Sequence, residues 1–276
     1  MSKLLGMVNT LKIEDTLDYL DGYIFGFRGF AINCLCSFSL EELIETIQKL
    51  KKQKKEIYLL MNKNMHKKDI KNLKSILKEI DKLKINGIFY ADNAFLTLKD
   101  ELNLQTKLVW YQEHLGTSYT SINTYYEYGI KSSVISNDIT IHEVKEIMEQ
   151  TNSELYYMIF GYLPMFVSER HQIQNYEKHF KLNGETNYNY FINENVKYPI
   201  IDNELGTFAF SSLPVFAYQE YLEIKDKMPY VILSDLLIEK EKFLQVLKKI
   251  KNETEEEIDI KTSPNFLYQD TIYKIK

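Results

Sequence analysis

The sequence predicts an α/β fold, a TIM-like (β/α)8 barrel with an inserted β-hairpin subdomain after strand seven. Short apolar runs alternate with amphipathic helical patterns along most of the 276 residues. Eight such alternations fall within roughly 250 residues, the usual length of this kind of barrel. No Gly-rich phosphate loop follows any strand, since GFRGF at 26–30 lacks the G-x-G-x-x-G spacing. This disfavours the alternative, an open doubly wound sheet.

Each predicted strand is a nearly continuous apolar run, which is typical of strands buried on both faces of a parallel sheet. The runs, in chain order, are 4–8, 22–27, 56–62, 87–92, 107–113, 132–136, 154–161 and 230–235. We therefore expect them to lie in one parallel sheet whose outer face is covered by helices.

Between these strands, apolar residues recur at helical spacing. Ser39, followed three residues later by Glu42, predicts a capping box at the start of the first helix. The second helical segment places its Leu and Ile residues on one stripe, which faces a core. The helical segments are 39–53, 68–84, 140–150 and 239–251.

The alternation breaks once, in an insertion at 181–228 after strand seven and its helix. Two β-rich runs there flank the turn-like DNELG at 202–206, which predicts an antiparallel hairpin. The C-terminal run 265–276 alternates like a strand and is a candidate to pair with that hairpin. Since the sequence has no linker and no second hydrophobic core, we expect a single barrel domain over 1–276 that carries this β-rich segment.

Composition excludes several classes of protein. Hydrophobic residues make up 45% of the chain and charged residues 26%, which is ordinary for a globular protein with a sizeable core. No apolar run could span a bilayer and the N-terminus lacks a signal-peptide core, so we expect no membrane association and a cytoplasmic location. The two cysteines, Cys34 and Cys36, exclude a disulfide framework and any four-thiolate site built from this chain alone.

Arginine is scarce, since only Arg28 and Arg170 occur among the 34 basic residues. A guanidinium binds a carboxylate or phosphate through two parallel hydrogen bonds, and Lys does not. Both arginines follow predicted strand ends. We therefore expect at least one of them to bind a small anionic ligand, and the alternative is chance retention on the surface.

In a barrel of this type the active site lies at the C-terminal ends of the strands. His114 and Asp92 are the candidates for catalysis there, with His114 as a general base or ligand. The alternatives are a loop histidine facing water and an aspartate that caps or forms a turn. No residue is assigned to a metal. The residues expected to bind substrate are Arg28, Asn62, Asp92, Gln112, His114, Asn137 and Arg170.

The segment ELYYMIFGYLPMFVSERHQIQNY (154–176) resembles the signature of the collagenase-like peptidase family U32. The downstream YPIIDNELGTFAFSSLPV (198–215) is similar to that family's second block, and segments 26–33 and 90–96 resemble further landmarks. The resemblance covers nearly the whole chain. The signature residues in register are Glu154, Gly161, Leu163, Ser168, Arg170, Asn175 and Tyr176.

The departures from the signature carry information. Pro164 and His171 stand where the family has cysteines, and Phe160 stands where it has histidine. In cluster-bearing relatives those cysteines hold an iron–sulfur cluster, so the resemblance implies that this chain alone holds no cofactor and meets a cluster only through a partner. The pattern is similar to a shorter, cysteine-poor, TrhP-like branch whose members occur alongside a longer paralogue in tRNA 5-hydroxyuridine synthesis.

The resemblance thus implies participation in 5-hydroxylation of the tRNA wobble uridine, with prephenate as the donor substrate and a longer U32 paralogue and tRNA as partners. Prephenate carries two carboxylates, which agrees with an anion clamp formed by Arg28 and Arg170. Two alternatives stay open. One is a metal-dependent collagenase-like peptidase, and the other is a non-catalytic partner subunit, which the net charge of −5 suits better than a lone RNA binder.

Overall fold

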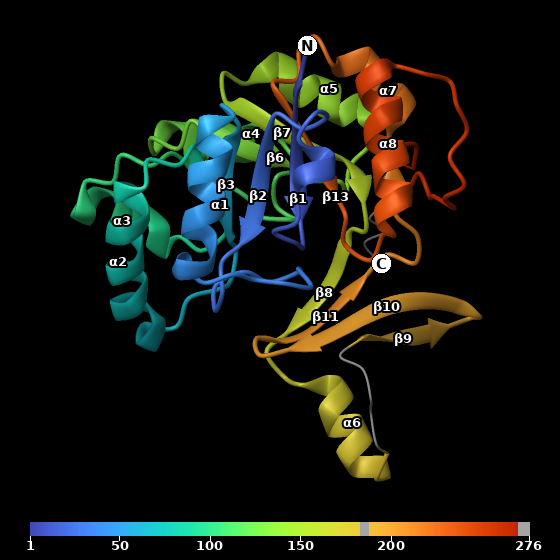
Figure 1. Cartoon of the computed structure of the whole chain (residues 1–276), viewed down its shortest axis with the longest axis horizontal. Coiled ribbons are helices and arrows are strands. Elements are labelled where there is room, and N and C mark those ends of the chain that lie inside the picture. The colour runs from blue at the N-terminus through green and yellow to red at the C-terminus, as the bar shows by residue number, and fades with distance from the viewer. Residues whose placement is uncertain (183–187, 270–276) are drawn as a thin grey trace, which may run out of the picture.

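Eight parallel strands close into a barrel with helices on its outside, which confirms the predicted fold class (Figure 1). The computed structural model describes residues 1–182 and 188–269. Strand β13 pairs with β1, and strands β1 to β7 pair with one another in chain order. The ring closes where β7 pairs with β13. The barrel strands are β1 (Lys3–Val8), β2 (Gly22–Gly26), β3 (Glu56–Met61), β4 (Gly87–Tyr90), β5 (Leu108–Trp110), β6 (Ser132–Ile135), β7 (Glu154–Gly161) and β13 (Tyr230–Ser234).

Helices cover the barrel between successive strands. The hydroxyl of Ser39 accepts a hydrogen bond from the Glu42 N–H and the Glu42 carboxylate accepts one from the Ser39 N–H, so the predicted capping box is confirmed. Between β1 and β2 the described chain forms only the short 3-10 helix η1 (Glu14–Thr16). The covering helices are α1 (Leu40–Lys52), α2 (Lys67–Lys82), α3 (Ala94–Leu102), α4 (Tyr119–Glu127), α5 (Ile141–Gln150), α7 (Tyr218–Ile224) and α8 (Lys240–Asn252). Within 1–182 and 188–269, no helix is long and apolar enough to cross a membrane.

The chain leaves the barrel directly after β7 and builds a four-stranded antiparallel sheet beyond the C-terminal ends of the barrel strands (Figure 1). Its strands pair in the order β8-β11-β10-β9, and α6 follows β8. A short strand β12 then pairs with the end of β7 before α7 returns the chain to the barrel. The inserted elements are β8 (Pro164–Ser168), α6 (Gln172–Phe180), β9 (Tyr188–Asn193), β10 (Val196–Asn203), β11 (Gly206–Phe210) and β12 (Val215–Phe216).

The insertion differs from the expectation in two respects. The hairpin around 202–206 is formed by β10 and β11, but the sheet begins at Pro164 rather than at 181, because β8 pairs with β11 and α6 belongs to the insertion. Of the C-terminal run 265–276, residues 265–268 form turns and residue 269 belongs to no strand, and 270–276 lie outside the described residues. The strands that flank the hairpin are β8 and β9, and a two-residue turn joins β9 to β10 at a small cost in loop entropy.

One buried carboxylate fastens α6 to the inserted sheet. Asp202 is 3% exposed and accepts hydrogen bonds from His171 Nδ1 at 2.8 Å and from the N–H groups of Ile173 and Gln174 in the first turn of α6. Thr207 Oγ1 donates to the Arg170 carbonyl and accepts from the Gln172 N–H. The block 198–215 therefore sets the position of the segment that joins β8 to α6.

Gly206 allows β11 to approach β8 closely. Its φ is +124°, and a Cβ at this position would lie 2.0 Å from the carbonyl oxygen of Ser168. Any larger residue would collide with the neighbouring backbone, so this glycine is required for the pairing of the two strands.

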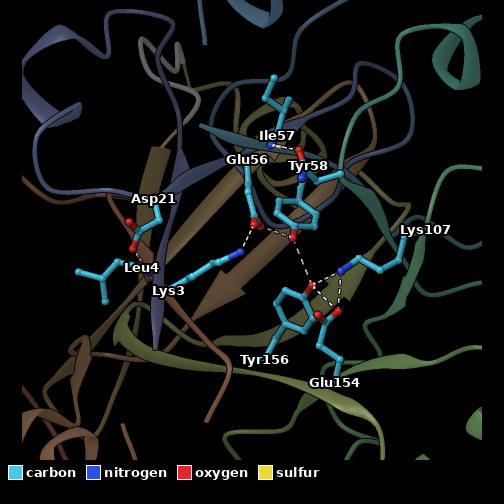
Figure 2. Close-up of polar contacts among 10 residues, drawn as sticks. Lys3, Leu4, Asp21, Glu56, Ile57, Tyr58, Lys107, Glu154 and Tyr156 are labelled. Atoms are coloured by element: carbon cyan, nitrogen blue, oxygen red, sulfur yellow. Dashed lines mark hydrogen bonds and ion pairs between the residues drawn. The ribbon is translucent and has the colours of Figure 1, made fainter. Parts of the chain in front are cut away.

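A polar network closes the N-terminal end of the barrel (Figure 2). Lys107 Nζ donates to Glu154 Oε2 at 2.5 Å and to Tyr156 Oη at 3.0 Å. The same ammonium lies 5.4–5.8 Å from the ring centroids of Tyr58, Tyr156 and Tyr230. Although burial acts in the opposite direction, the hydrogen bond and charge of Lys107 keep the pKa of Glu154 below its usual value. We infer that Glu154, a residue of the family signature, stabilises the barrel far from its mouth.

Replacing Lys107 with Met should lower the free energy of unfolding by about 1–2 kcal/mol, because Glu154 loses its charged partner and three rings lose their cation. Since the pKa of Glu154 is lower in the native state than in the unfolded state, the ion pair stabilises the protein above the unfolded-state pKa. This stabilisation is lost as the pH falls through the native-state pKa of Glu154. Urea unfolding at several pH values measures the effect. Lys74→Met, at an exposed pair with Glu101, is the control and should change stability little; equal losses in the two variants would contradict the assignment.

Candidate active site

Three adjoining cavities open at the C-terminal mouth of the barrel. Their volumes, with the open solvent at their entrances included, are about 340, 270 and 490 Å³. Tyr111, Glu113 and Pro164 line all three, so the segment that follows β5 and the first residue of the inserted sheet face the same space. The largest, which we call the mouth cleft, is lined by Ile32, Asn33, Asn62, Asn64, Ala91, Tyr111, Gln112, Glu113, His114, Pro164, Phe166 and Val167.

The carboxylate of Glu113 is held by two asparagine amides from other strand ends. Asn33 Nδ2 lies 2.7 and 2.8 Å from its two oxygens, and Asn62 Nδ2 donates to Oε1 at 3.1 Å. Asn62 is itself fixed, because its Oδ1 accepts from the Ile32 N–H at 2.9 Å. Burial raises the pKa of Glu113, while the hydrogen bonds from Asn33 and Asn62 oppose that rise.

His114 and Asp138 form an ion pair at the rim of the cavities. His114 Nδ1 lies 2.5 Å from Asp138 Oδ2, and the imidazole is about half exposed. The hydrogen bond that His114 donates to the Asp138 carboxylate raises the pKa of His114. The pair therefore stabilises the protein fully below the ordinary histidine pKa, and this stabilisation is lost as the pH rises through the native pKa.

Replacing Asp138 with Asn should lower the pKa of His114, because the imidazolium loses its carboxylate partner. An NMR titration of the His114 ring protons in the wild type and the variant measures this change. The other four histidines serve as internal references and should titrate alike in both proteins. An unchanged His114 titration would show that the ion pair does not form in solution.

The other strand-end residues of the predicted site mainly hold loops. Asp92 accepts from the N–H groups of Met65 and Ala94, each at 2.7 Å, as a turn former does, and its role in catalysis stays a prediction. Gln112 Nε2 donates to the Ala91 carbonyl and Asn137 Nδ2 donates to the Met158 carbonyl. Gln112 and Asn137 nevertheless line the mouth cavities.

The two arginines do not face a common cavity. The Arg28 guanidinium lies 2.8 Å from the carboxylate of Glu42 at the start of α1 and is half exposed. Arg170 is exposed at the far end of β8, and neither arginine lines any of the mouth cavities. The structure thus brings together Asn62, Gln112, His114 and Asn137, but leaves Arg28 and Arg170 outside, so it does not support the expected anion clamp.

The family model for peptidase family U32 matches residues 16–225 of this chain. The chain belongs to peptidase family U32. A 215-residue stretch is 24% identical to the tRNA hydroxylation protein P2 of Bacillus subtilis and covers 74% of this chain and 69% of that protein. An uncharacterized protease of Methanocaldococcus jannaschii is 26% identical over 184 residues, and the B. subtilis tRNA hydroxylation protein P1 is 22% identical over 158 residues. These matches cover 64% and 57% of this chain, but only 44% and 36% of the two relatives.

Solved structures agree with the barrel. The U32 peptidase Mk0906 gives a TM-score of 0.55 at 12% identity, covering 85% of this chain and 92% of that one. An orotidine 5′-monophosphate decarboxylase from M. jannaschii gives 0.51 at 15% identity, covering 93% and 100%. At such identities the likeness concerns the fold alone.

The residues of this U32 protein do not fit an iron–sulfur cluster at the signature positions. Pro164 begins β8, and His171 is hydrogen-bonded to buried Asp202. Cys34 is buried, with its pKa raised to about 12 by burial, whereas Cys36 is exposed. Among the residues that the structure describes, no group of three or more His, Cys, Asp or Glu side chains could hold a metal ion.

The predicted substrate-binding set of this U32 protein omits Glu113 and Asn33. In the sequence both are polar residues near strand ends. The contact between Asn33 and Glu113 joins positions 80 residues apart. Asn33 also adopts a left-handed φ of 59°, which the local sequence does not predict. The available signal was an acidic residue directly after an apolar strand, at the end of a barrel where functional groups gather.

Proposed function

We propose that this chain takes part in 5-hydroxylation of the tRNA wobble uridine, in the cytoplasm. The observation that carries the proposal is the 24% identity with the tRNA hydroxylation protein P2 over 74% of the chain. The mouth cleft supports it, because enzymes that modify a base hold it outside the helical stack in a pocket with hydrogen-bonding groups and a stacking wall. Amide side chains and the aromatic Phe166 line this cleft.

We further propose that a longer, cluster-bearing U32 paralogue is the partner. Bacillus subtilis holds two relatives of this chain, the tRNA hydroxylation proteins P1 and P2. The donor substrate, prephenate in the family resemblance, carries two negative charges, whereas the mouth cavities present no Lys or Arg. The donor and any cluster therefore belong with the partner. The peptidase alternative draws support only from the names of relatives, since His114 pairs with Asp138 and not with a hydroxyl or thiol nucleophile among the described residues.

Deletion of the gene, followed by mass spectrometry of tRNA nucleosides, tests the proposal. Nucleosides of the 5-hydroxyuridine type should fall strongly and return when the wild-type gene is restored. An unchanged nucleoside profile would end the proposal. Affinity purification of the tagged chain should recover the longer paralogue, and recovery of this chain alone would remove the partner from the proposal.

A further inference from the structure

One acceptor at the mouth cleft has no hydrogen-bond partner in the described structure. Asn33 is 8% exposed, and its Oδ1 is buried and unpaired. Leaving a buried acceptor unpaired costs about 1–3 kcal/mol unless a ligand or water meets it. Asn33 also lines two of the three cavities, so this oxygen is placed to receive a donor that enters the cleft.

Glu113 determines which end of the Asn33 amide faces the ligand. Both Glu113 oxygens accept from Asn33 Nδ2, at 2.7 and 2.8 Å. A rotated amide would place Oδ1 against this carboxylate, so the observed orientation is fixed. The left-handed backbone of Asn33, with φ of 59°, further restricts the side chain. Glu113 is therefore a positioning residue that keeps Oδ1 as the free acceptor.

The rest of the cleft favours a neutral ring. Among the residues that the structure describes, its lining contains the acidic Glu113 and no Lys or Arg, which disfavours an anion. Another part of the lining comes from β8, where Phe166 is 47% exposed and lines the cleft with Pro164 and Val167. An exposed aromatic ring of this kind stacks on the face of a planar heterocycle.

We propose that the mouth cleft binds a neutral heterocycle that carries a ring N–H, with Asn33 Oδ1 accepting from that N–H and Phe166 stacking on the ring. The choice of uracil as the ring rests on the proposed function. Asn33 thus recognises the hydrogen-bonding edge of the base, and Glu113 fixes the orientation of the Asn33 amide. Methylation of the ring nitrogen removes the donor and adds bulk, so it opposes binding on both counts.

The test compares binding of uridine and 3-methyluridine to the purified full-length chain by NMR titration. We expect the wild type to bind uridine at least about tenfold more tightly, the worth of one good hydrogen bond. In Asn33→Gly, which tolerates the left-handed backbone, and in Glu113→Gln, the preference should collapse toward equal affinities. A merely structural role for Glu113 would weaken both nucleosides in proportion and leave their ratio unchanged.

Matched controls are Asn103→Gly, at an exposed left-handed asparagine after α3, and Glu101→Gln, at an exposed ion pair. Both should keep the wild-type preference. Equal affinity of the wild type for the two nucleosides, an unchanged ratio in Glu113→Gln, or no uridine binding by the folded chain would each overturn the inference. Failure of the tRNA hydroxylation proposal is seen separately, as an unchanged nucleoside profile after gene deletion while the preference for uridine persists.

Discussion

Glu113→Gln is expected to reduce the tRNA modification restored by the gene at least about tenfold, while the variant protein resists unfolding better than the wild type. The carboxylate fixes the Asn33 amide, and Gln would let that amide rotate so that its free Oδ1 accepts from the new side-chain N–H. The site then loses its acceptor, but the fold gains a satisfied neutral pair worth about 1 kcal/mol. Nucleoside mass spectrometry and urea unfolding measure the two effects.

The gain in stability has a defined pH dependence. Burial raises the pKa of Glu113 in the native state, so the wild type loses stability as the pH rises from the unfolded-state pKa of about 4.3 through the native value. The difference between Glu113→Gln and the wild type should widen over this interval and stay constant above it. His114, Asp138 and Tyr111, which also face Glu113, are present in both proteins. A difference that does not vary with pH, or a less stable variant, would contradict this account; Glu101→Gln is the control.

Asp202→Ala is expected to destabilise the inserted sheet by about 2 kcal/mol, the upper range for the loss of a helix cap. The substitution removes one buried acceptor shared by His171 and two N–H groups in the first turn of α6, and it leaves these donors to water. Hydrogen exchange should speed up in α6 and β10 while the barrel strands keep their protection. Modification of tRNA should also fall, because β8 supplies the wall of the mouth cleft.

The control for this variant is Asp100→Ala, at an exposed position on α3, which should leave exchange unchanged. Uniform loss of protection across the barrel and the inserted sheet would mean that the two unfold together. That outcome would contradict the local role assigned to Asp202.

Asp202 also changes how the family motif is understood. In the sequence, the block 198–215 is similar to a family motif, but the sequence does not indicate its structural role. In the structure, Asp202, Gly206 and Thr207 position the turn between β8 and α6. Since β8 begins at Pro164, which lines all three cavities, and Phe210 lines one of them, this block helps to form the wall of the site.

The sequence by itself determined the barrel, the capping box at Ser39 and Glu42, the hairpin around 202–206 and the family. These features depend on side chains a few residues apart, whose periodicity and turn chemistry are readable along the chain. The sequence also placed Asn62, Gln112, His114 and Asn137 at strand ends, because the fold class alone locates the mouth.

Only the tertiary structure decided which of these groups meet. The structure does not support the clamp expected from Arg28 and Arg170. Arg28 pairs with Glu42 on the neighbouring helix, and Arg170 lies just after β8 of the inserted sheet and lines none of the mouth cavities. Asn33 contacts Glu113 because barrel closure brings together strand ends that are 80 residues apart along the chain. The left-handed backbone at Asn33 also sets the direction of its side-chain amide. Such convergence depends on strand register and loop conformation, which the spacing of residues along the chain does not encode.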